Sequence, residues 1–394
     1  MLDKKILRRP FFYDWEVDND IVYFSMCYYN ALCKANLNND QVEIIGTFPG
    51  VPYEKGNEYF GIYRYENYLL LGPIKSTDDF FVYDTLHSQF FKIPNEGENR
   101  FYSIRVFAKD HCLYIVTMKT AQVNRIDLKD FSAKCVMHNE FEVDNAQVIN
   151  VERVDDLLYI PVNQKKKLII FSIEKGEYSY CRFPSNVSAI STIDYYDGRF
   201  WITGEEKKIF AWDVDEKEAQ EIVDFPDDIR LFFSRNNWFE NSFIYNDCLW
   251  LFPAYADLIL KYNILTKRLE KFEISGEEED PEKIDEELRS GRQFASKYNV
   301  VKRYGNRAFF FSSKTRIFYE INLQTNKLYK HDFKMIYLYN NQIYPLVGNE
   351  IMSEIRYELE GLIRILTKKV TNISVKKEQI IGNIIYDRIS KDNK

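Results

Sequence analysis

Apolar and polar positions along the chain repeat as a unit of two short apolar strands joined by a polar turn. The stretch GRFWITGEEKKIFAWDV, which starts at Gly198, is one example. The first apolar residues of the seven copies are Ile21, Leu69, Leu113, Leu157, Phe200, Leu249 and Ala308. Their spacings are 48, 44, 44, 43, 49 and 59 residues. A period in the forties is typical of propeller blades built from four short strands.

Further strand-like stretches flank each hairpin. Outer strands such as HSQFFKIP and KRLEKFEI follow the hairpins, and inner strands such as FYSIRVFAKD and ISTIDYYDG precede them. Four-stranded sheets bury both faces only when they pack radially against one another, and a closed ring leaves few exposed edges. We therefore predict an all-β protein over residues 1–347, a β-propeller of seven blades with four antiparallel strands each. Six or eight blades are the alternatives.

These repeats resemble bacterial β-propellers of the kelch-like or quinoprotein-like type, in which each repeat reads D..LW..P.....I..YD..T......F. The resemblance covers roughly residues 11–335 and implies the fold. The chain departs from the kelch pattern because no Gly-Gly pair recurs, and from the WD40 pattern because no Trp-Asp ends each blade. The resemblance therefore transfers no site residues to this sequence.

Two segments interrupt or follow the repeats. An insertion at about 275–296 is strongly acidic, with eight acids against two bases in residues 277–289. It is expected to form an exposed helix or loop, with a lid or partner contact as the alternative. The hairpin-like stretch IYLYNNQIYPLV, at 336–347, either begins an eighth blade or completes the ring beside the N-terminal strand PFFYDWEV.

Residues 348–394 switch to a helical pattern and form a predicted C-terminal helical appendage. Apolar residues recur at spacings of 4, 4, 3 and 4, and a second isoleucine cluster follows. This second cluster fits a short helix, or less well a hairpin over Gly382-Asn383. Either the appendage packs on the propeller or it docks a partner protein through Ile355, Leu359, Leu362, Leu366, Ile381 and Ile385. Residues 361–394 carry a net charge of +5, so contact with an anionic membrane surface is a weaker alternative.

Composition narrows the class of protein. The net charge of −7 argues against nucleic-acid binding through the surface as a whole. The six cysteines form no CxxC pair and the four histidines are scattered, so no zinc site is predicted. The start of the chain has no apolar signal region, and the cysteines suit a reducing compartment. We expect a cytoplasmic protein without cofactor or metal.

A candidate ligand site comes from the turns inside the repeated hairpins. In a propeller these turns share a face with the loops between blades, around the central channel. The predicted ligand-binding residues are Lys75, Lys119, Lys166, Lys207, Lys208, Tyr255, Lys314 and Arg316. If the basic residues point inward, they form a cationic ring that attracts a phosphate, a carboxylate or an acidic sugar. Solvated lysines in exposed turns are the alternative.

No catalytic motif is found: the sequence has no Gly-rich phosphate loop, no GxSxG and no HExxH. The leading hypothesis is a non-catalytic binding or scaffold propeller that contacts another protein through its channel face or its C-terminal helices. The alternative is a carbohydrate-active propeller of the hydrolase or lyase class, or one that binds an anionic small molecule.

Overall fold

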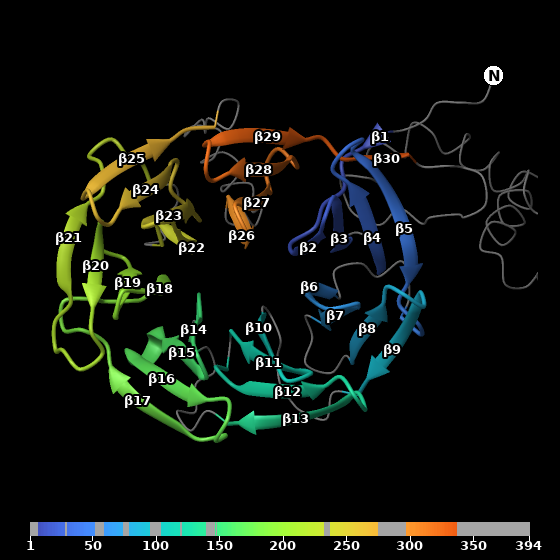
Figure 1. Ribbon diagram of the computed structural model, residues 1–394, viewed down its shortest axis with the longest axis horizontal. Helices are drawn as coiled ribbons and strands as arrows, with labels where there is room; N and C mark the ends of the chain where they lie inside the picture. The colour runs from blue at the N-terminus through green and yellow to red at the C-terminus, as the bar shows by residue number, and fades with distance from the viewer. Residues whose placement is uncertain are drawn as a thin grey trace, which may run out of the picture.

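The computed structural model describes residues 7–27, 30–51, 59–73, 79–94, 104–118, 120–138, 146, 148–231, 237–274 and 297–336. Within these residues, seven sheets, each built on four antiparallel strands, stand side by side around a common centre (Figure 1). This confirms the predicted propeller of seven blades, rather than one of six or eight blades. The acidic insertion at 275–296 and the helical segment at 348–394 lie outside the described residues.

Each blade runs from an innermost strand outward in chain order. The innermost strands are β2 (Trp15–Asp18), β6 (Tyr59–Tyr65), β10 (Ile104–Lys109), β14 (Glu152–Val154), β18 (Thr192–Tyr196), β22 (Phe239–Tyr245) and β26 (Tyr298–Tyr304). The second strands are β3 (Ile21–Ser25), β7 (Tyr68–Pro73), β11 (Cys112–Thr117), β15 (Leu157–Val162), β19 (Arg199–Thr203), β23 (Cys248–Pro253) and β27 (Arg307–Ser312).

The outer half of each blade holds two more strands. The third strands are β4 (Ala31–Asn36), β8 (Phe80–Asp84), β12 (Val123–Asp127), β16 (Lys167–Ser172), β20 (Lys208–Trp212), β24 (Ile259–Asn263) and β28 (Phe318–Asn322). The outermost strands are β5 (Gln41–Thr47), β9 (Gln89–Ile93), β13 (Ser132–Met137), β17 (Tyr178–Arg182), β21 (Gln220–Asp224), β25 (Arg268–Phe272) and β29 (Lys327–His331). The hairpins recognised in the sequence are thus the second and third strands.

Helical structure is minimal in the part of the chain that the structure describes. A single 3-10 turn, η2 (Asn163–Lys165), joins β15 to β16. No helix among these residues is long and apolar enough to cross a membrane. The predicted cytoplasmic location stays a prediction.

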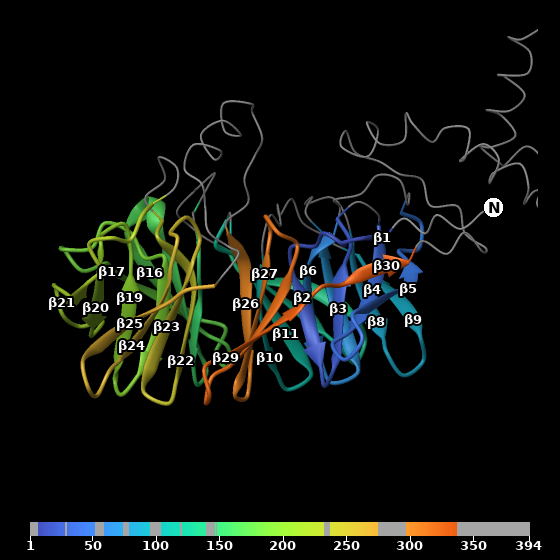
Figure 2. The same cartoon turned by 90° about the horizontal axis from the view of Figure 1, so that it is seen from above.

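Two-residue turns join the innermost strand of every blade to its second strand, and we name these seven turns the inner turns. Their first residues all have positive φ: Asn19, Glu66, Asp110, Asp155, Asp197, Asn246 and Gly305. Positive φ matches the right-handed twist of a tight hairpin, and it favours Gly, Asn and Asp. The inner turns lie on one face of the ring, and the turns between second and third strands lie on the opposite face (Figure 2).

The hydrophobic core is divided into seven clusters, one in each seam between neighbouring blades. Successive residues of one strand point to opposite faces of its sheet. On β7, Leu69 and Leu71 therefore pack against blade 1, whereas Leu70 packs against blade 3. Aromatic rings fill the wide seams, as where Phe12 stacks on Phe311 with ring centroids 4.2 Å apart.

The ring closes where blade 7 meets blade 1. After β29 the chain continues as β30 (Lys334–Ile336), which pairs in parallel with β5 of blade 1. A strand from the N-terminal side, β1 (Leu7–Arg8), then pairs antiparallel with β30. Blade 1 therefore has six strands rather than the predicted four. The described strand β30 joins the edge of blade 1, whereas the rest of the predicted hairpin, residues 337–347, lies outside the described residues.

A charged side chain also joins the first and last blades near the ring centre. The Lys302 ammonium, on β26, lies 2.8 Å from Asp14 Oδ1 and 2.7 Å from Glu16 Oε1. It also donates to the Ile62 carbonyl at 3.0 Å, so it links blade 7 to both blade 1 and blade 2. Burial alone would lower the pKa of Lys302, but the two carboxylates outweigh it and raise that pKa.

Replacing Lys302 tests this closure. Lys302→Met should lower the stability by about 3 kcal/mol, because Glu16, only 5% exposed, loses its countercharge. Chemical unfolding monitored by tryptophan fluorescence measures the effect. The control Lys34→Met breaks an exposed ion pair with Glu43 and should cost less than about 1 kcal/mol. Equal losses in the two variants would contradict a special role for Lys302.

Candidate functional site

Charged residues recur at one level of the innermost strands, close to the ring centre. The residues two positions before each strand's last residue are Glu16, Tyr63, Phe107, Glu152, Asp194, Phe243 and Lys302. Four of these seven are charged. Because every innermost strand ends in an equivalent turn, these residues occupy matching levels around the axis. The seven innermost strands surround that axis (Figure 1).

Polar side chains join most neighbouring innermost strands. Asp14 Oδ2 accepts the Ile62 amide at 3.0 Å, between blades 1 and 2. Asn241 accepts the Val301 amide at 3.3 Å and donates to the Tyr298 carbonyl at 3.1 Å, between blades 6 and 7. An innermost strand has a sheet neighbour on one side only, so its inward-facing backbone groups need such partners.

Two acidic side chains whose charges act on each other lie on the innermost strands of the neighbouring blades 4 and 5. Glu152 is on β14 and Asp194 is on β18, and Glu152 Oε1 accepts the backbone amide of Tyr195 at 3.2 Å. Asp194 is only 7% exposed, and its Oδ2 atom forms no hydrogen bond with any described residue. In the described part of the chain, neither carboxyl group forms an ion pair with a cation. Glu152 keeps partial contact with solvent.

The pKa values of this acidic pair lie near neutrality. Burial raises the pKa of Glu152 to about 8, and the nearby charge of Asp194 adds to the rise. Burial also raises the pKa of Asp194 to about 7, and the hydroxyl of Ser242 on β22 partly offsets this. The Ser242 Oγ lacks hydrogen-bonding geometry toward the described residues, so its help is weak. Ionising both acids at once is therefore unfavourable.

Other charges at the ring centre face opposite charges. Lys302 contacts two carboxylates, and the half-buried Arg105 on β10 is under the attraction of Asp14 and Glu240. Among the described charges at this level, Glu152 and Asp194 are the exception, because neither forms an ion pair with a described cation. Strongly shifted acids near a central axis are typical of functional sites, since they oppose folding unless a ligand compensates them.

Two of the lysines predicted from the sequence contact their own blade. The Lys208 ammonium lies 2.5 Å from Glu221 Oε2 and 3.5 Å from Asp224 Oδ1, both on the outermost strand β21. The Lys207 ammonium donates to the Asp227 carbonyl at 3.2 Å and lies 5.8 Å from the ring centroid of Trp238.

The other predicted ligand residues are dispersed. Lys166 is exposed at the end of η2, Tyr255 is buried at 6% exposure, and Lys314 is exposed. Arg316 lies 5.6 Å above the ring centroid of Phe11. Lys75, Lys119 and the predicted partner-binding residues of the C-terminal segment lie outside the described residues, so the cationic ring and the tail contact stay predictions.

Sequence reasoning missed the acidic pair. The signal was available in the stretches VERVDD and STIDYYDG, where an acid stands three residues before the first residue of an inner turn. DWEVDND and VKRYGN place Glu16 and Lys302 at the same point of the repeat. Aligning the innermost strands on their turns, rather than the hairpins on their apolar residues, would have revealed this level.

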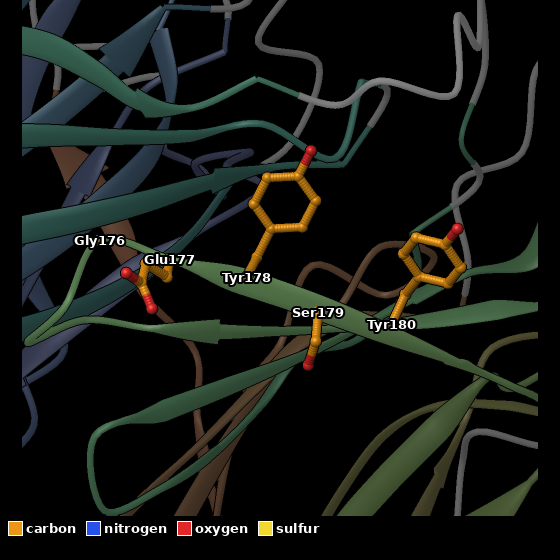
Figure 3. Close-up of a pocket in the computed structure, with 5 residues that line it drawn as sticks. All are labelled: Gly176, Glu177, Tyr178, Ser179 and Tyr180. Carbon is orange, nitrogen blue, oxygen red and sulfur yellow. The ribbon is translucent and has the colours of Figure 1, made fainter.

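A groove lies on the opposite side of blade 4, along the outermost strand β17. Gly176, Glu177, Tyr178, Ser179 and Tyr180 line it. Tyr178 and Tyr180 project to one side of the strand and Ser179 to the other (Figure 3). The Lys167 ammonium lies 4.0 Å from the ring centroid of Tyr180. This groove is open and separate from the ring centre.

Within the described ranges, no three His, Cys, Asp or Glu side chains lie close enough together to hold a metal ion. The acidic pair offers two carboxyl groups, which can accept charge-assisted hydrogen bonds from a cationic group.

Comparisons with known proteins identify the fold. No family model and no curated protein matches the sequence. The computationally designed Ika8 protein is similar at 10% identity and a TM-score of 0.52, over 83% of this chain and 89% of Ika8. PorZ, an essential bacterial surface component of the type-IX secretion system of Porphyromonas gingivalis, is similar at 9% identity and a TM-score of 0.52. That likeness covers 84% of this chain but only 39% of PorZ. At such identities, these likenesses show the fold alone.

The raised pKa of Asp194 predicts a pH-dependent gain in stability on neutralisation. An acid with a raised pKa in the folded state costs stability above its unfolded pKa of 3.8, and the cost grows until pH exceeds about 7. Asp194→Asn should therefore stabilise the protein by on the order of 2 kcal/mol at pH 8.5 and by little at pH 4.0. Urea unfolding midpoints at the two pH values measure this difference.

A matched control has the opposite sign. The pKa of Asp156 is lowered by its hydrogen bond with Lys109, so its ionised form favours folding above its unfolded pKa. Asp156→Asn should therefore reduce stability at pH 8.5. A loss of stability in Asp194→Asn at pH 8.5 would contradict the unfavourable ionisation of the pair.

Proposed function

We propose that the protein is a non-catalytic binding propeller that holds a cationic group of its ligand at the ring centre. The propeller fold supports a binding or scaffold role in general. The observation that carries the finer proposal is the Glu152–Asp194 pair. It consists of two mutually repelling acids, one of them 93% buried, that no described cation compensates.

A bound cation would relieve this repulsion. With an ammonium or guanidinium group between the carboxylates, both acids can ionise, and each gains an attractive interaction in a partly desolvated site. Asp194 Oδ2 would gain the hydrogen-bond partner that it lacks among the described residues. The free protein instead holds protons on the pair near neutral pH, so binding releases protons.

The anionic-ligand alternative receives less support from the described residues. Lys207 and Lys208 were its central members, and both contact oxygen atoms within blade 5. An anion at these lysines would have to displace Glu221 from Lys208. For the carbohydrate-active alternative, the other described acids near the ring centre, Asp14 and Glu16, are already paired with Lys302.

Binding of small cations tests the proposal. Agmatine and spermidine, titrated by calorimetry, should bind about tenfold more tightly at pH 8.5 than at pH 6.0, because the pair loses its protons at pKa values of about 7 and 8. Asp194→Asn and Glu152→Gln should each weaken binding at pH 8.5 at least about tenfold, which is about 1.4 kcal/mol.

The control variant is Glu221→Gln, which removes an acid from the outermost strand of blade 5 and should leave the cation affinity unchanged. An absence of cation binding at pH 8.5 would contradict the proposal. So would tighter binding at pH 6.0, or preferential binding of phosphorylated or uronic-acid ligands.

A further inference from the structure

The inner turns carry more negative charge than their conformation requires. Every first residue has positive φ, and Asn19, Asn246 and Gly305 adopt this conformation without charge. Asp110, Asp155 and Asp197 occupy equivalent positions as acids. The backbone conformation explains why Asn, Asp or Gly stands there. It does not explain why aspartate stands at three of these positions, since asparagine adopts the same conformation without a charge.

Exposed acids occur in the inner turns of five consecutive blades. They are Asp20, Glu66, Asp110, Asp155 and Asp197. Because the inner turns follow the innermost strands, these acids stand around the ring centre on one face of the propeller (Figure 2). We name this set the acidic rim. One member of the acidic rim, Asp20, lies 3.8 Å from Arg307 Nη1, and no ion pair joins Glu66, Asp110, Asp155 or Asp197 to a cation within the described residues.

The acidic rim is continuous with the buried pair. Asp155 follows Glu152 by three residues and Asp197 follows Asp194 by three residues, each in the inner turn directly after its strand, β14 or β18. Each of these two strands thus carries an acid near the ring centre and leads to an exposed acid at the face. Between them, Tyr195 is 38% exposed and packs against Phe200 with ring centroids 5.1 Å apart. An exposed tyrosine ring next to acids is suited to contact a cationic side chain.

We infer that the cationic ligand is a basic segment of a partner protein, and that it docks on the face of the inner turns. One lysine or arginine side chain is held by Glu152 and Asp194, and neighbouring basic residues lie over the acidic rim. This inference rests on the proposed function, since it names the source of the cation. It assigns the partner to the face opposite the lysine-containing turns predicted from the sequence.

The distribution of charge favours a peptide over a small amine. A small amine needs two carboxylates, whereas the rim spreads acids over five of the seven blades. Charges of one sign arranged around a site accelerate the association of an oppositely charged partner and confer salt dependence. The net charge of −7 for the whole chain acts in the same direction.

A binding experiment with two ligands tests the inference. The peptide probe is a capped decapeptide of alternating glycine and lysine, and the small probe is agmatine. The rim variant is Asp110→Asn/Asp155→Asn/Asp197→Asn, in which each asparagine suits the turn as Asn246 does. It should weaken peptide binding at least about tenfold and flatten its salt dependence. Agmatine affinity should change by less than about threefold.

The matched control removes the same number of acids elsewhere on the blades. Glu177→Gln/Asp215→Asn/Glu216→Gln changes exposed residues of the turns that lead to the outermost strands β17 and β21, away from the ring centre. It should leave peptide affinity within about twofold of the unsubstituted protein. Equal weakening by the two triple variants would overturn the inference, because net charge alone would then explain it.

The outcomes separate this inference from the proposed function. If agmatine binds and depends on Asp194, but the peptide binds no more tightly than agmatine or ignores the rim variant, the inference is wrong and the proposed function stands. If agmatine does not bind at pH 8.5, the proposed function is wrong. If the rim variant unfolds at the same temperature as the unsubstituted protein, misfolding is excluded as the cause of its lost binding.

Discussion

Every blade of this protein is buried on both faces, and this constraint governs the rest of the structure. Leu69 and Leu71 pack toward one neighbouring blade while Leu70 packs toward the other, and the same alternation holds around the ring. No blade therefore contains a complete hydrophobic core of its own. A blade left at an open end would expose a full apolar face, so the stability of each blade depends on closure of the whole ring.

The innermost strands obey a second constraint, because each has a sheet neighbour on one side only. Side chains such as Asp14 and Asn241 supply hydrogen bonds across the seams, and Lys302 bridges three blades. Glu152 and Asp194 stand in the same layer but add repulsion instead of a compensated contact. Ionised acids that oppose folding in this way are more typical of binding sites than of structural layers, which is the basis of the proposed cation site.

The sequence predicted the architecture because the second and third strands are apolar on both faces and recur at a nearly constant spacing. Leu249 and Phe200 mark such strands without any structural knowledge. The candidate site could not be predicted in the same way. Glu152 lies on a three-residue strand, too short for a periodic pattern, and its meeting with Asp194 depends on how neighbouring blades are placed. The lysines were noticed because they recur in the turns, but the partners of Lys208 on β21 are set by strand pairing. The position of β30 also required the closed ring.

The pairing of β30 with β5 has a consequence for the order of folding. Residues 41 and 334 become partners, so nearly the whole propeller must leave the ribosome before the edge of blade 1 is covered. Blades 2 to 6 can pack on one another as they are synthesised. Until β30 and blade 7 have been made, the edge strand β5 of blade 1 is unpaired and the apolar face of blade 1 toward blade 7 is uncovered. Such long-range pairing slows folding and prolongs exposure of an aggregation-prone edge. The first blade to be synthesised is therefore the last to be completed.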